Sequence, residues 1–333
     1  MAIIIFIVLA IVTVYIPDDE ENADKEKNEL VGTDTVNGIM PIGLDDRLPK
    51  DTKEHLVVSQ PLEENPYDEL NELIGLESVK EEVITLANFV KVQQQRKEQG
   101  LKTPKMSYHL VFTGSPGTGK TTVARIVARI YKDLGILKKG HTVETDRSGL
   151  VAEYMGQTAI KTNAIVDSAL NGVLFIDEAY SLVPEDGKGH DYGQEAISTL
   201  LKRMEDDRDK LVVIIAGYTN EMKRFIDSNP GLQSRFNRYI NFPDYTPEEL
   251  RDIFKMYLRK NQYTVSADAE HYLTVRLDSA VRHKDKNFGN ARYVRNVFEK
   301  AISQQANRLA TMKNYTKEQL SELTVSDLSK AFN

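Results

Sequence analysis

The sequence predicts an α/β protein, with a parallel sheet followed by a small all-helical domain. Between about 107 and 244, short apolar runs typical of buried strands alternate with helical patterns, which suits right-handed crossovers. From Thr246 onward only helical patterns occur, beginning with a capping box at Thr246-Pro247-Glu248-Glu249. The expected strands lie near 109–112, 142–145, 173–176, 211–216 and 239–242.

The first strand leads into a glycine-rich turn and then a helix. Residues 114–121, GSPGTGKT, match the phosphate-binding loop G-x-x-x-x-G-K-[ST], and apolar residues at 123, 126, 127 and 130 have helical spacing. A strand, a glycine turn and a helix start place the positive end of the helix on bound phosphates. The expected ATP-binding residues here are Gly114, Ser115, Pro116, Gly117, Thr118, Gly119, Lys120, Thr121 and Thr122.

Two acidic residues follow the third expected strand. Val173 to Ile176 are apolar, and Asp177 and Glu178 come directly after them, where a doubly wound sheet presents its ligand site. Asp177 is expected to hold Mg²⁺ through water, with Thr121 as the second metal-binding residue. Glu178 is expected to act as the general base that polarises the attacking water.

These motifs and their order resemble AAA+ ATPases, and within them the branch that contains CbbX, SpoVK and EccA. The resemblance covers about Leu70 to Asn333. It implies a ring-forming homo-oligomer, expected to be a hexamer, that hydrolyses ATP with Mg²⁺ and binds nucleotide between sheet domain and lid. The matching blocks are 114–122, 150–159, 174–180, 216–218, 229–236, 242–245 and 289–296.

The resemblance also implies roles for residues outside the phosphate-binding loop. Arg235 is expected to be the arginine finger that reaches the γ-phosphate of the adjacent subunit, with Arg238 as a weaker candidate. Arg292 is similar to the sensor 2 arginine of the lid. Sensor 1 is Thr219 or Asn220, and alignment of the strand favours Thr219.

Tyr154-Met155-Gly156 matches the aromatic–hydrophobic–glycine pore loop of AAA+ rings that thread proteins. An aromatic side chain grips peptides with little sequence preference, and glycine lets the loop move. The alternative is a tyrosine buried in the core. A second pore-facing loop is expected within Pro184 to Gly193.

Composition excludes several classes of site. The chain has no cysteine, so it has no disulfide, thiol nucleophile or Cys-ligated zinc, and its six histidines show no metal-binding spacing. The net charge of −7 gives no overall attraction for nucleic acid, and no nucleic-acid partner is expected.

Four segments follow along the chain. Residues 1–16 are an apolar segment, interpreted as a short membrane anchor, a partner-binding segment or an artefact of the start codon. Residues 17–66 are expected to be an acidic flexible linker. Residues 67–245 form the nucleotide-binding domain with a leading helix, and 246–333 the lid. The ATPase part is expected in the cytoplasm, with membrane contact through residues 2–16 under the first interpretation.

The expected function is remodelling or partial threading of an unidentified protein partner. One alternative is a factor that uses ATP to set its own assembly at a membrane or secretion complex. A less favoured alternative is a nucleic-acid motor, which the acidic composition and the absence of an appended DNA-binding motif oppose.

Overall fold

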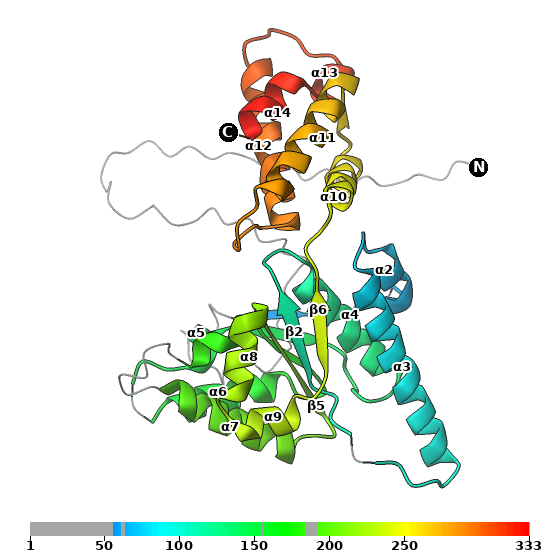
Figure 1. Ribbon diagram of the computed structural model, residues 1–333, viewed down its shortest axis with the longest axis vertical. Helices are drawn as coiled ribbons and strands as arrows, with labels where there is room; N and C mark the ends of the chain where they lie inside the picture. The colour runs from blue at the N-terminus through cyan, green and yellow to red at the C-terminus, as the bar shows by residue number, and fades with distance from the viewer. Residues whose placement is uncertain (1–55, 61–63, 105, 155, 184–191, 333) are drawn as a thin grey trace, which may run out of the picture. The chain divides into compact units, whose positions relative to one another are not determined.

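The computed structural model describes residues 56–60, 64–104, 106–154, 156–183 and 192–332. Its main sheet has six strands in the order β1-β3-β4-β5-β2-β6, with helices on both sides (Figure 1). The strands are β1 (Val57–Ser59), β2 (Leu110–Gly114), β3 (Thr142–Thr145), β4 (Gly172–Ile176), β5 (Leu211–Gly217) and β6 (Tyr239–Phe242).

Neighbouring strands from β3 to β6 are parallel, as expected, and β1 pairs antiparallel with β3. Strand β1 corrects the expectation that all of 17–66 is linker. Val57 pairs with Glu144 and Ser59 with Thr142, and the Ser59 hydroxyl donates to Glu144 Oε1 over 3.2 Å. The ladder has only three residues, which is too short a pattern to read as a strand even though two of them are valines. Residues 17–55 of the expected linker and the apolar segment 1–16 lie outside the described residues.

Alternate residues of the central strands face opposite layers of helices. Phe112 and Ile214 belong to the core beneath one layer, whereas Val111 and Val213 belong to the core beneath the other. This alternation follows from the pleat of a strand. The first layer contains α3 (Glu77–Glu98) and α4 (Lys120–Asp133), and the second α6 (Thr158–Ser168), α7 (Tyr192–Asp206), α8 (Thr219–Asp227) and α9 (Pro230–Arg235). The short helices α5 (Arg147–Leu150) and η1 (Ala179–Leu182) complete the domain.

Two helices precede the first parallel strand. The short helix α2 (Pro66–Glu72) is not among the elements expected from the sequence. It is capped by Asn65, whose side chain accepts from Tyr67 N. Gly75 and Leu76 both have positive φ and turn the chain into α3. Helix α3 ends at Glu98, and Gly100, two residues later, has a φ of +72°.

The lid consists of helices and one very short pair of strands. The predicted capping box is confirmed. The Thr246 hydroxyl at the start of α10 accepts from Glu249 N, and the Glu249 carboxylate accepts from Thr246 N. Arg308 on α12 pairs with the buried Asp327 on α14 at 2.9 Å. The elements are α10 (Pro247–Lys260), β7 (Thr264–Val265), α11 (Ala267–Arg282), α12 (Ala291–Leu309), α13 (Lys317–Ser321), β8 (Glu322–Leu323) and α14 (Val325–Ala331).

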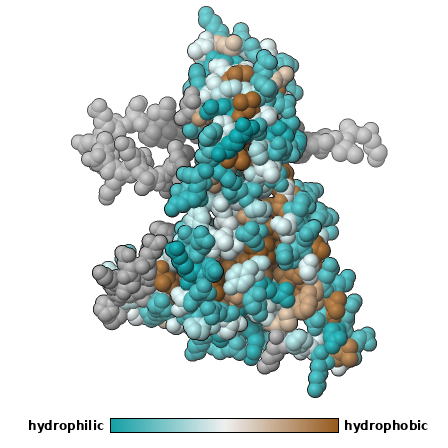
Figure 2. All heavy atoms as spheres, in the orientation of Figure 1, coloured by the Kyte–Doolittle hydropathy of each residue, from teal (hydrophilic) through white to brown (hydrophobic). Residues whose placement is uncertain are grey.

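On the face shown in Figure 2, hydrophilic residues make up most of the surface. Within the part of the chain that the structure describes, no helix combines the length and the apolar character needed to cross a bilayer.

Candidate nucleotide site

The phosphate-binding loop joins the end of β2 directly to the start of α4. Gly117 and Gly119 have φ of +68° and +93°, a backbone region in which side chains other than glycine are strained. Gly119 caps α4 without any side-chain hydrogen bond. The first amides of α4 therefore have no side-chain cap and can donate to an anion.

Lys120 is the first residue of α4, and only 9% of its surface is exposed. Its Nζ donates to the carbonyl oxygens of Gly114 at 2.9 Å and Ser115 at 2.8 Å. Burial lowers the pKa of Lys120, while the negative charges of Asp177 and Glu178 oppose that effect. The lysine therefore lies within electrostatic reach of both acidic residues predicted for the site.

Asp177 and Glu178 lie at the carboxyl end of β4, a strand whose five residues are all buried. Asp177 is half-buried, its N–H donates to Thr145 O, and its Oδ1 accepts from Glu178 N at 3.0 Å. Glu178 is exposed and has a positive φ of 46°. The turn thus holds one carboxylate against the sheet and presents the next to solvent.

Strand β5 lies between β2 and β4, so its carboxyl end reaches the same edge of the sheet. Thr219 and Asn220, the two candidates for sensor 1, both lie exposed at the start of α8. The preceding residue, Tyr218, was not predicted to belong to the site. Burial raises the pKa of Tyr218, and Glu178 raises it further, while its ring lies 6.1 Å from that of Tyr180. Its position directly after β5 is the sequence signal that would have identified it.

Arg292 is exposed in the first turn of α12, and its charge reaches the site. Burial has the largest effect on the pKa of Lys120, which it lowers, and of Tyr218, which it raises. The charge of Arg292 lowers both pKa values. The structure therefore brings together the lysine, the two acids and the lid arginine that the sequence placed up to 172 positions apart (120 to 292).

Arg235 lies away from this group, at the last position of α9. Because Tyr239 at the start of β6 pairs in parallel with Val111, Arg235 belongs to the edge of the sheet opposite the phosphate-binding loop. Its Nη2 lies 3.6 Å from Glu205 Oε2, and its backbone oxygen accepts from Ser107 Oγ at 2.7 Å.

Tyr154 is 67% exposed, so the alternative of a core tyrosine is wrong. Gly156 has a φ of +79°, and a Cβ there would meet no atom within 4 Å. Met155 and most of the second expected loop, 184–191, lie outside the described residues, whereas Tyr192 and Gly193 begin α7.

Two residues that contact the phosphate-binding loop were missed as site residues. Asn290 donates to Pro116 O, and the side chain of Asp244 accepts from both Asn290 and Ser115. Both residues occur in blocks that carry the resemblance, but their contact with the loop depends on folding across 174 positions of sequence for Asn290.

Comparison with solved structures supports the fold. The crystal structure of the FIGL-1 AAA domain superposes with a TM-score of 0.58 and 17% sequence identity, covering 89% of each chain. The same domain in complex with ADP gives a TM-score of 0.57 at 18% identity, covering 84% of this chain and 86% of that one.

Similar sequences cover most of the chain. Stage V sporulation protein K of Bacillus subtilis is 43% identical over 266 residues, which are 78% of this chain and 81% of that protein. The chloroplastic ribulose bisphosphate carboxylase/oxygenase activase of Cyanidioschyzon merolae is 46% identical over 78% of this chain and 88% of its own length. The ESX-3 secretion system protein EccA3 of Mycolicibacterium smegmatis is 43% identical over 85% of this chain but only 47% of its own length.

Family models match both folded parts. Residues 110–244 match the ATPase family associated with various cellular activities (AAA), and residues 246–333 match the AAA lid domain. With the resemblance to SpoVK, rubisco activase and EccA also confirmed, this chain belongs to the AAA family of ATPases.

Proposed function

We propose that this protein is a ring-forming, Mg²⁺-dependent ATPase, expected to be a hexamer, that remodels or partly threads a protein partner. One observation carries the proposal. Lys120, Asp177 and Arg292 converge at one edge of the sheet, whereas Arg235 lies at the opposite edge. A complete hydrolytic site then needs the arginine of a second copy.

Lys120 and the loop amides are the groups proposed to bind the phosphates of ATP. The lysine is held by two carbonyl oxygens of the loop itself, and an incoming phosphate offers a stronger, charged acceptor for the same ammonium group. Arg292 adds a second cation from the lid, and Thr219 a hydroxyl near the end of β5.

Thr121 and Asp177 fit a magnesium site. They offer a hydroxyl and a carboxylate, the oxygen ligands that Mg²⁺ binds, and both are half-buried at the same sheet edge. Among the described residues, no group of three His, Cys, Asp or Glu is placed to hold a metal alone. That suits a cation that takes its other ligands from water and phosphate, where it offsets the charge on the β- and γ-oxygens.

Glu178 is proposed to orient the attacking water and accept its proton. Its exposed position beyond the half-buried Asp177 leaves the carboxylate open to solvent, and the hydrogen bond from Glu178 N to Asp177 Oδ1 fixes the turn between them. General-base catalysis of this kind contributes about 10²–10⁴ in rate.

Arg235 is proposed to act on the nucleotide of the adjacent subunit. In the single chain its Nε is buried without a hydrogen-bond partner among the described residues, and its side chain is 28% exposed. Its guanidinium makes a long ion pair with Glu205 at 3.6 Å and a hydrogen bond from Nη1 to Ser234 Oγ at 3.3 Å, and it can exchange the exposed carboxylate for a new anionic partner. By analogy with related GTPases, such a residue contributes roughly 10³–10⁵ in rate.

Tyr154 is proposed to grip the protein partner. A large aromatic ring in a loop, exposed and followed by an unobstructed glycine, is suited to contact with an extended peptide. The similar proteins are named for sporulation, rubisco activation and secretion, so their names do not single out one partner. Similarity to a secretion-system protein is the observation that favours the second candidate, an ATP-controlled assembly factor, and the apolar segment 2–16 would then contact a membrane.

The test is site-specific cross-linking in the Glu178→Gln protein, which should hold ATP without turnover. A photoreactive amino acid replaces Tyr154, and in a matched control it replaces Tyr315, a lid tyrosine that is 46% exposed. We expect ATP-dependent cross-links to protein at 154, none with ADP, and none at 315. Equal cross-linking at both positions, cross-links to nucleic acid, or a monomer with ATP by light scattering would each contradict the proposal.

A further inference from the structure

Asn290 connects three segments that are far apart in the sequence. It lies immediately before α12, and none of its surface is exposed. Its Oδ1 accepts from Tyr245 N at 3.0 Å, in the segment between sheet domain and lid. Its Nδ2 lies 3.2 Å from Pro116 O in the phosphate-binding loop and 3.0 Å from Asp244 Oδ1.

The pattern of partners fixes the orientation of the amide. Tyr245 N is a donor, so the amide oxygen must face it, and the NH₂ group then faces oxygen atoms only, including Phe288 O at 3.2 Å. An aspartate of the same shape would keep the contact with Tyr245 but would oppose its second oxygen to Asp244. The site therefore selects asparagine by its hydrogen-bond chemistry.

The backbone of Asn290 is strained to make these contacts. Its φ of 47° and ψ of −121° lie in a region that favours glycine. Such a conformation is energetically unfavourable for residues other than glycine and persists only where the surroundings enforce it, often at switch segments. The residue at this position is nevertheless an asparagine, and its side chain makes all the contacts described above.

The loop around Asn290 also approaches the phosphate-binding loop through backbone atoms. Ala291 N donates to Gly117 O at 3.1 Å. A Cβ on Gly117 would lie 2.1 Å from Gly289 O, so only glycine permits this approach. The start of α12 therefore rests on the loop that is expected to bind phosphate.

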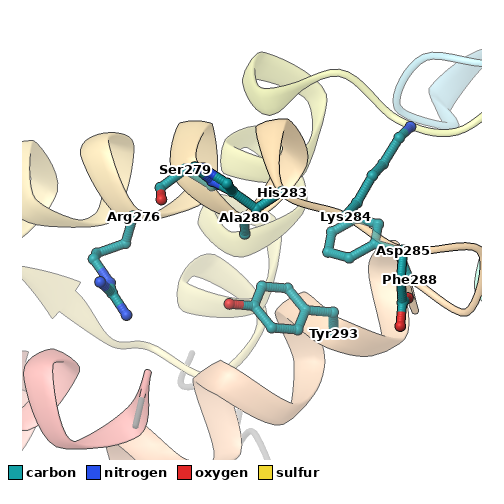
Figure 3. A pocket seen from close by; sticks show the side chains of 8 residues that line it. All are labelled: Arg276, Ser279, Ala280, His283, Lys284, Asp285, Phe288 and Tyr293. Carbon is teal, nitrogen blue, oxygen red and sulfur yellow. The ribbon is translucent and has the colours of Figure 1, made fainter.

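Asp244 holds the same junction from the other side. Lys284, in the loop that follows α11, has its Nζ 2.6 Å from Asp244 Oδ2, and in Figure 3 its side chain extends away from Tyr293 and Arg276. Burial alone would raise the pKa of Asp244, but hydrogen bonds from Lys284, Ser115 and Asn290 outweigh it and lower the pKa. The carboxylate thus joins the phosphate-binding loop to both ends of the α11–α12 loop. Phe288, within that loop, packs on Tyr293 with ring centroids 5.2 Å apart.

We propose that Asn290 and Asp244 form a latch that couples nucleotide binding in the phosphate-binding loop to the position of the lid. The inference rests on nucleotide binding at this loop. Lys120 must release Gly114 O and Ser115 O to take up phosphate, and the neighbouring Pro116 O and Ser115 side chain are held by the latch. A shift of the loop then acts on Tyr245 and on the start of α12. Asn290 is proposed as a positioning residue, which acts through its hydrogen bonds to Tyr245, Pro116 and Asp244.

The test measures lid movement by fluorescence energy transfer. The chain contains no cysteine, so two introduced ones at exposed positions, Asp209→Cys and Glu318→Cys, take the dyes specifically. Energy transfer is compared between nucleotide-free protein and protein saturated with a non-hydrolysable ATP analogue. Asn290→Gly removes the side chain and relieves the backbone strain, and we expect it to abolish most of this change in transfer. Affinity for the analogue should weaken by roughly 5- to 150-fold, the usual range of such coupling.

Asn287→Gly, at an exposed position of the same loop, is the matched control and should behave like the wild type. A full change in transfer in Asn290→Gly, an equal loss in Asn287→Gly, or no change in wild-type protein that binds the analogue would overturn the latch. If Asn290→Gly does not melt cooperatively, Asp244→Asn decides: it should reduce the change, and an unaltered change would overturn the proposal. Wild-type protein that binds no nucleotide would instead refute the proposed function, and the latch with it.

Discussion

Lys120 and Glu178 lie at the same edge of the sheet in opposite environments. The lysine is buried against carbonyl oxygens, whereas the glutamate is exposed on a left-handed turn. Both were identified from sequence because each belongs to a contiguous motif whose strand and helix context can be read locally. Tyr218 and Asn290 were not, because their contribution depends on which strand ends and loops meet in space.

Substitutions of Lys120 and Glu178 should therefore affect different steps, nucleotide binding and ATP turnover respectively. Lys120→Ala removes a charged hydrogen-bond donor and should weaken ATP binding by about 10- to 150-fold. Glu178→Gln keeps the shape of the side chain but not its basicity, so binding should be retained while turnover falls by about 10²–10⁴. Titration with a fluorescent nucleotide and measurement of phosphate release separate the effects. An equal loss of binding in both variants would contradict this division of roles.

His109 should make stability depend on pH. Its Nδ1 accepts from Val213 N at 2.9 Å, and burial, with Arg235 nearby, lowers the pKa of His109 to about 4. In the unfolded chain the pKa is about 6.5, so on acidification the unfolded state takes up the proton first. The free energy of unfolding is therefore highest above pH 6.5, and this group removes about 3 kcal/mol of it as the pH falls to 4.

Urea unfolding between pH 7.5 and 4.5 measures this dependence. His109→Asn keeps an acceptor for Val213 N but does not titrate, so its unfolding free energy should vary less with pH than that of the wild type. His283→Asn, at an exposed position, is the control and should leave the dependence of the unfolding free energy on pH unchanged. An unaltered slope in His109→Asn would show that other groups cause the acid sensitivity.

At the scale of elements, the parallel strands were predicted closely and the connections less well. Each expected strand agrees with the structure to within two residues at either end. For β2, β4 and β5 the reason is that a fully buried strand reads as a largely continuous apolar run. Helices α8 and α9 and strand β1 were missed, since segments of three to nine residues carry too few periods to identify. These short elements nevertheless determine which side chains reach the edges of the sheet.

Helix α9 makes a prediction about subunit complementation. It ends in Arg235 at the sheet edge opposite the phosphate-binding loop, so Arg235→Ala should bind ATP nearly as well as the wild type yet hydrolyse it slowly. Mixed with Lys120→Ala protein, it should recover activity at interfaces that pair an intact loop with an intact arginine. Phosphate release across a series of mixing ratios tests this. Activity that merely averages the two variants, in rings shown to have mixed, would indicate that Arg235 serves its own chain.

At the scale of the whole molecule, the sequence predicts a sheet domain followed by a helical lid, and the structure and family models confirm this arrangement. The capping box at Thr246 and the change to purely helical periodicity marked the boundary. What local patterns could not supply is how the lid meets the loop, because that junction consists of single hydrogen bonds made by Asn290 and Asp244. Single hydrogen bonds of this kind produce no periodic pattern from which they could be predicted in the sequence.

Strand β1 provides the last prediction, because it extends the sheet from within the segment expected to be linker. Leu56, next to this strand, is buried in the same core as Val143 and Ile165. A chain beginning at Glu63 loses that burial and should be less stable than one beginning at Asp51 by about 1.5–3 kcal/mol. For a domain of this size, the melting temperature should fall by about 3–12 °C. Both chains should hydrolyse ATP, since three strands separate β1 from β2.

Leu56→Ala in the chain beginning at Asp51 is the matched variant, and it should show most of the same loss of stability because burial of the leucine side chain is the main contribution. Calorimetry of the three proteins, with phosphate release measured in parallel, decides between the alternatives. Equal melting temperatures for the two chain lengths would mean that β1 contributes little to the fold. Loss of hydrolysis in the shorter chain at a temperature where it remains folded would mean that β1 affects the nucleotide site, contrary to its place at the far edge of the sheet.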